Sequence, residues 1–176
     1  MATTTESTGR APAKYYAGIG ARSTPDSIQT LMRRLAMRLG REGWTLRSGG
    51  AEGADTAFEL GASSVHAPVD IYRPSPTIPA WAYQTVDRYH PRPDRLSNYV
   101  RRLHARNAMI LEGFSRQNLV RFILCWTPGA KITGGTGQAL RIALDYGIPV
   151  RNLANPRIHA SALAWLDTEI THEHED

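Results

Sequence analysis

YYAGIGAR, at residues 15–22, is the stretch that decides the fold of this chain, and a second stretch of the same design, LRSGGAEGAD, follows at residues 46–55. Each passes from a short apolar run through a turn with few side chains into an amphipathic segment, the pattern of a strand leading into a helix. The start of such a helix has free backbone N–H groups and the positive end of the helix dipole, so it attracts an anion. We therefore expect both turns to hold a phosphate.

Apolar and turn residues alternate along the rest of the chain in the manner of an α/β protein. Thr24 is a suitable N-cap, Pro25 suits the first helical position, and apolar residues then repeat at helical spacing up to Leu39. The same reasoning predicts strands at residues 14–19, 44–48, 69–72, 120–126 and 149–153. It predicts helices at residues 25–42, 54–63, 103–113 and 137–146. We expect an α/β, Rossmann-like three-layer sandwich with a mainly parallel sheet.

Three glycine-bearing turns, at residues 18–22, 48–55 and 133–138, each follow a predicted strand. The carboxyl ends of parallel strands share one edge of the sheet, where ligands of such folds bind, so the three turns should meet there. Thr133 and Thr136 would add hydroxyl donors to the amide groups of the third turn.

The segment 74–102 is the least regular part of the expected domain. It is punctuated by prolines and interleaves aromatic and basic side chains, namely Trp81, Tyr83, Arg88, Tyr89, His90, Arg92, Arg95, Arg101 and Arg102. That mixture suits stacking on bases while neutralising phosphates, so we expect an irregular insertion that acts as a lid or a single-strand channel. The alternative is that the aromatic side chains cover the core and the arginines are solvated.

We expect one domain over residues 14–170. A disordered polar tail at 1–13 precedes it, and an acidic tail at 171–176 follows it. Met1 to Arg10 lack the apolar run of a secretory signal, and no run approaches the ~20 apolar residues that cross a bilayer. We therefore expect a cytoplasmic protein, in the host cytoplasm if it is encoded by a phage, with no membrane partner.

The chain carries 21 basic and 16 acidic residues, and arginine supplies nearly all of the positive charge, because lysine occurs only as Lys14 and Lys131. Arginine suits bidentate phosphate contacts, although a GC-rich genome also raises its share, so the composition favours a nucleotide or nucleic-acid partner mildly. Cys125, the only cysteine, excludes an internal disulfide and is predicted to be a buried hydrophobe. His172 and His174 are predicted to be solvent-exposed, and we expect no metal and no cofactor.

Four motifs in order, GIGAR at 18–22, SGGAEGAD at 48–55, HARN at 104–107 and GGTG at 134–137, resemble those of the SLOG superfamily. That superfamily includes DNA-processing protein A (DprA), the LOG-type cytokinin-activating phosphoribohydrolases and nucleotide-sensing domains of bacterial defence proteins. The chain is most similar to the small DprA-like proteins of phages and prophages. The resemblance covers roughly residues 14–153.

The resemblance implies which residues contact the ligand. The glycines allow close backbone approach, Arg22 and Arg106 would pair with a phosphate, and Asn107 would hold the turns together by side-chain hydrogen bonds. Asp55 either caps its helix or takes part in the site. The predicted ligand-binding residues are Gly18, Gly20, Ala21, Arg22, Ser48, Gly49, Gly50, Ala51, Asp55, Arg106, Asn107, Gly134, Gly135, Thr136 and Gly137.

One departure from the family bears on catalysis. LOG-type hydrolases carry a Pro-Gly-Gly-x-Gly-Thr-x-x-Glu pattern whose glutamate helps to cleave the N-glycosidic bond, whereas this chain has no proline there, Gln138 at the threonine position and Arg141 at the glutamate position. An arginine cannot act as a general base at neutral pH, so the usual LOG mechanism is not expected. Asp55 and Glu59, four apart on one predicted helix face, could replace it as a carboxylate pair, or could be a cap and a surface charge.

The sequence thus leads to three hypotheses. The first is a binding protein for a nucleotide, a nucleotide-derived signal or single-stranded DNA, which acts without catalysis. The second is a nucleoside-monophosphate N-glycosidase or deoxyribosyltransferase that uses Asp55 and Glu59. The third is an interaction module that has lost its pocket, against which the preserved donors of the turns argue. Since dimers are common in the superfamily, a homo-oligomer is expected.

Overall fold

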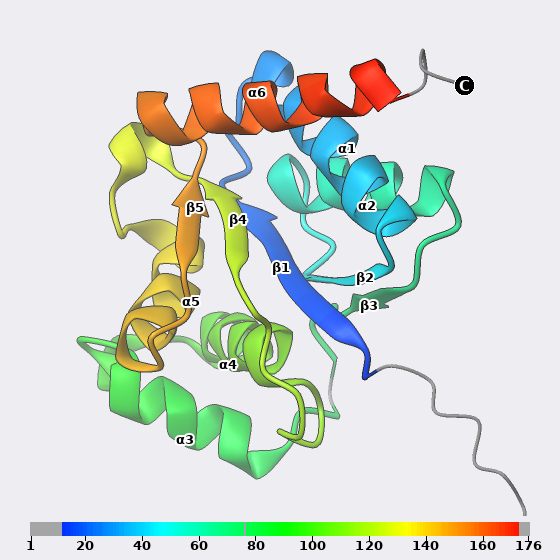
Figure 1. Cartoon of the computed structure of the whole chain (residues 1–176). Helices are drawn as coiled ribbons and strands as arrows, with labels where there is room; N and C mark the ends of the chain where they lie inside the picture. The colour runs from blue at the N-terminus through cyan, green and yellow to red at the C-terminus, as the bar shows by residue number, and fades with distance from the viewer. Residues whose placement is uncertain (1–11, 76, 173–176) are drawn as a thin grey trace, which may run out of the picture.

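The computed structural model describes residues 12–75 and 77–172. Its centre is a five-stranded sheet in the order β3-β2-β1-β4-β5, in which every paired strand is parallel (Figure 1). The strands are β1 (Lys14–Gly20), β2 (Trp44–Ser48), β3 (Val69–Ile71), β4 (Ile123–Trp126) and β5 (Val150–Asn152). The predicted α/β class and parallel sheet are confirmed. The predicted tails fall largely outside the described residues.

In the described residues, six α-helices cover the two faces of the sheet. Two short 3-10 helices, η1 (Pro93–Arg95) and η2 (Pro128–Ala130), lie between them in the chain. The α-helices are α1 (Asp26–Arg41), α2 (Ala54–Ser64), α3 (Ala80–Tyr89), α4 (Asn98–Glu112), α5 (Gly134–Asp145) and α6 (Pro156–His172). One core joins α1, α2 and α6 to the sheet face that bears Tyr16 and Leu46. The other joins α3, α4 and α5 to the face that bears Ala17 and Ile19. The result is the predicted three-layer sandwich, visible in Figure 1.

The prediction of an irregular insertion at 74–102 is wrong, because most of that segment is helical. Pro79 stands at the N-cap of α3 and Pro91 follows its last turn, so these prolines bound the helix instead of interrupting it. Inside α3, Ala82, Thr85 and Val86 are buried at helical spacing. The next helix, α4, begins at Asn98, where the Ser97 hydroxyl accepts a hydrogen bond from the Val100 amide at 3.3 Å.

The aromatic side chains of this segment belong to the core layer. Trp81, Tyr83 and Tyr89 pack partly buried against the cluster between α3, α4 and α5. The Trp81 indole donates a hydrogen bond to the Phe114 carbonyl at 3.2 Å, after the end of α4. Several of the arginines are also paired with neighbouring carboxylates, such as Arg101 with Asp87 at 2.6 Å. The alternative prediction, aromatic side chains that cover the core, describes this segment better than a channel does.

Helix α6 was not predicted from the sequence. Its start is set by Asn155, whose side-chain oxygen accepts hydrogen bonds from the Arg157 and Ile158 amides at 2.9 and 3.4 Å. Pro156 at its first position completes a recognisable helix start that the sequence prediction overlooked. None of the helices in residues 12–75 and 77–172 is long and apolar enough to span a membrane.

We expect Gly18→Ala to destabilise the fold. A Cβ at residue 18 would lie 2.5 Å from a Phe58 ring carbon and 2.9 Å from a Leu46 methyl. The face of β1 that packs against α2 therefore has no room for it. Overpacking of this kind costs about 1–3 kcal/mol in the free energy of unfolding, which urea denaturation would measure. The matched control is Gly135→Ala, because a Cβ at Gly135 meets nothing within 4 Å. An equal loss in both variants would contradict the packing explanation.

Candidate functional site

A pocket of about 460 Å³ lies at the carboxyl edge of the sheet, where the three glycine-bearing turns meet the first half of α4. The predicted convergence of the turns at one rim is therefore found in the structure. The pocket is lined by Ile19, Gly20, Ala21, Arg22, Ala51, Asp55, Val100, Leu103, His104, Arg106, Asn107, Pro128, Thr133, Gly134, Gly135 and Thr136.

The Asp55 carboxylate joins the first turn to the second. Asp55 lies in the first turn of α2 and is only 5% exposed. One of its oxygens accepts a hydrogen bond from the Gly20 amide at 3.2 Å, and the other accepts one from the Ala51 amide at 3.3 Å. Burial raises the pKa of Asp55 to about 6, while the nearby Arg106 guanidinium and the backbone N–H donors oppose that rise. Asp55 is thus both part of the pocket wall and the structural link between two turns.

The Arg106 guanidinium lies beneath the second turn. It is 7% exposed, and its Nη1 donates to the carbonyls of Gly49 and, at 3.2 Å, of Tyr72. A Cβ at Gly49 would overlap this guanidinium, so glycine is required there. The Arg106 Nε has no hydrogen-bond partner among the described residues. Burial lowers the pKa of Arg106 and the Arg22 charge lowers it further, whereas Asp55 raises it, so two positive charges stand near one another at this pocket.

The start of α5 provides backbone donors at the opposite side of the pocket. Thr133 is its N-cap residue, and no side chain caps the first amides of this twelve-residue helix. Gly134 and Gly135 are exposed, and Gly134 has a φ of +65°, a conformation that favours glycine. The Asn107 side chain donates a hydrogen bond to the Gly135 carbonyl at 2.9 Å. Asn107 therefore holds α4 to the third turn, in keeping with the role that the resemblance implies.

His104 is a wall residue to which the sequence analysis assigned no role. It is 7% exposed, and its Nδ1 has no hydrogen-bond partner within the described residues. Its ring stacks at a tilt on His90, with centroids 5.0 Å apart. Burial is the main reason that the pKa of His104 is lowered to about 4. The neighbouring His90, Arg141 and Arg106 lower it further. The imidazole is therefore neutral at pH 7.

Ten of the predicted ligand-binding residues line the pocket, while five do not. The five residues that lie outside the pocket wall are Gly18, Ser48, Gly49, Gly50 and Gly137. The Ser48 hydroxyl, for example, is fully buried and donates to the Gly18 carbonyl at 2.6 Å, so it joins β2 to β1 instead of facing the pocket. An apolar wall made of Ile19, Val100, Leu103 and Pro128 was also missed. Val100 was missed because the sequence analysis began that helix at residue 103.

The carboxylate pair of the enzyme hypothesis is not brought together at the pocket. Glu59 is absent from the pocket wall and forms an ion pair with Arg73, with nitrogen-to-oxygen distances of 3.1 and 3.2 Å. Arg141, which the resemblance aligns with the LOG glutamate, donates to the Tyr89 carbonyl at 3.2 Å and to the Gln138 side chain at 3.0 Å. Arg141 thus ties α5 to α3. Asp55 is the one carboxylate that lines the pocket in the described part of the chain.

The described residues contain no group of three or more His, Cys, Asp or Glu side chains that could hold a metal ion. The predicted exposure of His172 and His174 concerns side chains that lie outside the described part of the structure. Cys125 is fully buried in β4, and burial raises the pKa of its thiol to about 12, as expected of a core residue.

Solved structures of other proteins share this fold. The chain resembles DNA processing protein A from Helicobacter pylori, whose structure describes a single-stranded DNA binding mode, with 14% identity, a TM-score of 0.55, and 91% of this chain and 81% of that chain covered. It also resembles the Moco carrier protein of Chlamydomonas rheinhardtii, with 16% identity, a TM-score of 0.53, and 90% and 86% covered. No protein-family profile and no curated protein sequence matches the chain. The likeness supports the fold that the DprA resemblance implied, and it concerns the fold alone.

We expect His104 to make the protein less stable in mild acid. The pKa of His104 is about 4 in the folded chain and 6.5 in the unfolded chain. Between pH 4 and pH 6.5, the unfolded chain is therefore protonated at His104 whereas the folded chain is not. Stability from this residue is complete above about pH 6.5 and is lost as the pH falls toward 4. Relative to His104→Gln, the wild type should lose roughly 1–2 kcal/mol of unfolding free energy between pH 7 and pH 5.

Urea denaturation of both proteins at the two pH values measures this difference. Asp55 titrates in the same window with the opposite sign, because its pKa is raised in the folded chain, but its contribution is common to both proteins and cancels. A wild-type-to-variant difference that is the same at pH 7 and pH 5 would contradict the buried, neutral imidazole.

Proposed function

We propose that this chain is a binding protein for a phosphate-bearing nucleotide, either free or as one nucleotide of a single strand, held in the pocket at the carboxyl edge of the sheet. The observation that carries the proposal is the division of the pocket wall. One part of the wall presents Arg22, Arg106 and the uncapped start of α5, and another part is apolar. A nucleotide has the matching division into an anionic group and a flat, largely apolar base.

The phosphate side rests on three kinds of donor. The Arg106 Nε is buried and has no partner among the described residues, a costly state that an anionic ligand would relieve. Arg22 is exposed and forms none of the ion pairs found in the described chain. The start of α5 adds amide donors and the positive end of a helix dipole.

The base side rests on the apolar wall. Ile19 and Pro128 come from the strand ends, and Val100 and Leu103 come from α4. Neutral His104 borders the same space and can donate one hydrogen bond and accept another, which suits a polar base edge better than an imidazolium would. A volume of about 460 Å³ falls within the range of small-ligand pockets and accommodates one nucleotide. The single-stranded DNA described for the H. pylori protein of the same fold is a ligand of the same chemistry.

We favour binding over N-glycosidic cleavage because of how the carboxylates are used. The Asp55 carboxylate accepts hydrogen bonds from two turn amides, and Glu59 is paired with Arg73 outside the pocket. A two-carboxylate mechanism needs both groups beside the scissile bond. Asp55 would therefore have to act alone and give up its structural bonds.

Thermal-shift and calorimetric titrations would test the proposal with AMP, dAMP, a cyclic dinucleotide and a short oligodeoxythymidylate, against adenosine as the phosphate-free control. A ligand present at 100 times its dissociation constant adds about 2.7 kcal/mol to the free energy of unfolding. Stabilisation by the phosphate-bearing compounds and not by adenosine is expected, and the relative affinities distinguish a free nucleotide from a strand. Chromatography of the same mixtures should return the ligand intact; free base would instead support the enzyme hypothesis.

We predict that Arg22→Gln weakens binding of the best ligand about tenfold or more, because a charge-assisted hydrogen bond contributes roughly 1.5–3 kcal/mol. Arg106→Gln should abolish measurable binding, but it also removes the bonds to Gly49 and Tyr72, so its unfolding free energy must be measured in parallel. The matched control is Glu59→Gln, which loses only the ion pair with Arg73 and should bind normally. Unchanged affinity in Arg22→Gln, or lost affinity in Glu59→Gln, would overturn this placement of the phosphate.

A further inference from the structure

A second hollow lies away from the pocket at the carboxyl edge. It lies between α1 and α6, beside the starts of β2, β4 and β5. Its volume is about 790 Å³. Leu35 and Leu39 of α1 form one side, and Ile158, Ala162 and Trp165 of α6 form the other. We call this hollow the α1–α6 groove. It shares no lining residue with the nucleotide pocket.

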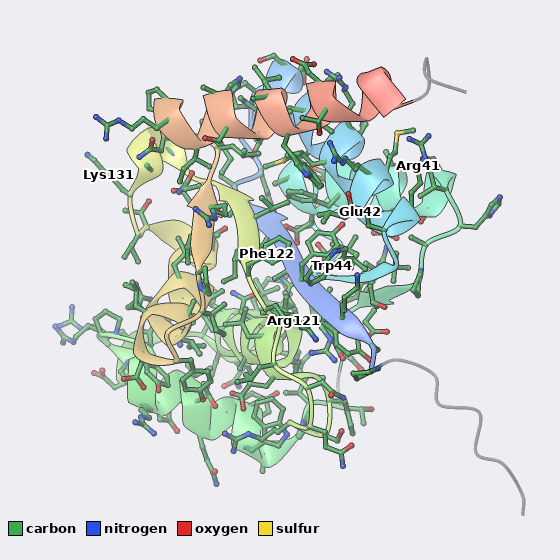
Figure 2. All side chains as sticks on the ribbon, in the orientation of Figure 1. Arg41, Glu42, Trp44, Arg121, Phe122 and Lys131 are labelled. Carbon is green, nitrogen blue, oxygen red and sulfur yellow. The ribbon has the colours of Figure 1, made fainter. Side chains whose placement is uncertain are left out.

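The floor of the α1–α6 groove is aromatic. Trp44 and Phe122, which begin or precede neighbouring strands, are partly buried there, and their rings meet edge to face with centroids 5.0 Å apart. Phe122 stacks on Tyr16 behind it, at 5.7 Å. Figure 2 shows Trp44, Phe122 and Arg121 close together on the front of the molecule, below α6. This floor offers aromatic surface to a ligand, and Lys14 and Arg121 lie over the Trp44 ring, 4.9 and 5.9 Å from its centroid.

The lining of the groove carries positive charge. Arg121, Arg151 and Arg157 line it, are exposed, and take part in none of the ion pairs of the described chain. The single acidic residue of the lining, Glu42, is bound to Arg38 at 3.1 Å. The groove therefore has a net positive rim over an apolar floor.

Two of these arginines occupy positions at which a positive charge does not stabilise the fold. Arg157 is in the first turn of α6, where the helix dipole disfavours a positive charge. Arg151 is in edge strand β5, and its neighbour Val150 packs against the α3–α5 core. Because side chains alternate along a strand, Arg151 faces the α6 side of the sheet. Both place a guanidinium beside the apolar floor.

We infer that the α1–α6 groove binds a small organic carboxylate with a flat apolar body, at a site separate from the nucleotide pocket. The volume lies within the range of small-molecule sites, whose walls are mostly apolar with a few polar groups that fix the ligand. The aromatic floor takes the apolar body, and Arg151 and Arg157 take the carboxylate as charge-assisted hydrogen-bond donors. A second copy of this chain would have to present an acidic apolar surface to fit here. A small organic carboxylate needs only the aromatic floor and the arginines that already line the groove.

The test is a titration of the full chain, labelled with nitrogen-15, with 2-naphthoate, and in parallel with 2-naphthamide, its uncharged analogue of the same shape. The indole N–H signals of Trp44 and Trp165 report on the groove and are assigned with Trp→Phe variants. The Trp81 indole, which is bound to the Phe114 carbonyl in the other layer, is the internal control. We expect saturable shifts of the Trp44 and Trp165 signals with naphthoate, no shift of Trp81, and about tenfold weaker binding of the amide.

The double variant Arg151→Gln, Arg157→Gln should bind naphthoate as weakly as the amide, while Arg34→Gln, an exposed arginine of α1 outside the groove, should bind it normally. Adding the best nucleotide should leave the naphthoate titration unchanged, so that a failure of the nucleotide proposal does not affect this result. Equal affinity for acid and amide, no shift, or an equal shift of Trp81 would overturn the inference. Movement of the Trp44 and Trp165 signals when the protein alone is concentrated would overturn it in favour of self-association.

Discussion

The carboxyl edge of this protein depends on two buried, opposite charges that bind backbone instead of each other. Asp55 accepts the amide hydrogens of Gly20 and Ala51, and Arg106 donates to the carbonyls of Gly49 and Tyr72. A buried charge is tolerated only where hydrogen bonds replace its lost hydration. The turns adopt an arrangement that gives each of the two groups two backbone partners, while the Arg106 Nε is left without a partner among the described residues.

This arrangement explains why the turns hold both structural and pocket residues. Gly49 has no side chain because Arg106 occupies that space, and a Cβ at Gly53 would strike the carbonyls of Ala21 and Arg22. The second turn is thus packed directly on the first. What remains open to solvent is a narrower set of groups, namely the ends of the turns, the start of α5 and the wall of α4. The proposed ligand site is the space that the structural bonds leave unfilled.

The sequence was a good guide to the strands and to helices α1, α2, α4 and α5, whereas α3 and α6 were missed. Strands with short apolar runs followed by glycine turns were predicted close to their observed bounds, because burial on both faces leaves a strong local signal. Helix α3 was missed because the prolines that bound it and the arginines of the segment suggested a loop. Its docking rests on three buried residues, Ala82, Thr85 and Val86, and on aromatic side chains that pack partly buried against the same core. Helix α6 was overlooked although Asn155 and Pro156 mark its start, and its packing against α1 and β5 fixes its place.

For the candidate site, the glycine-bearing motifs predicted which turns would come to one rim, since parallel strands send all their carboxyl ends to the same edge. The resemblance further implies that Arg141 replaces the glutamate of the LOG-type pattern. Only the tertiary structure decided how each group is used. Glu59 pairs with Arg73 and Ser48 with the Gly18 carbonyl, whereas Val100, Leu103 and His104 enter the wall. The physical reason is that a motif specifies backbone conformation locally, while the partner of a polar side chain is set by elements far away in the sequence.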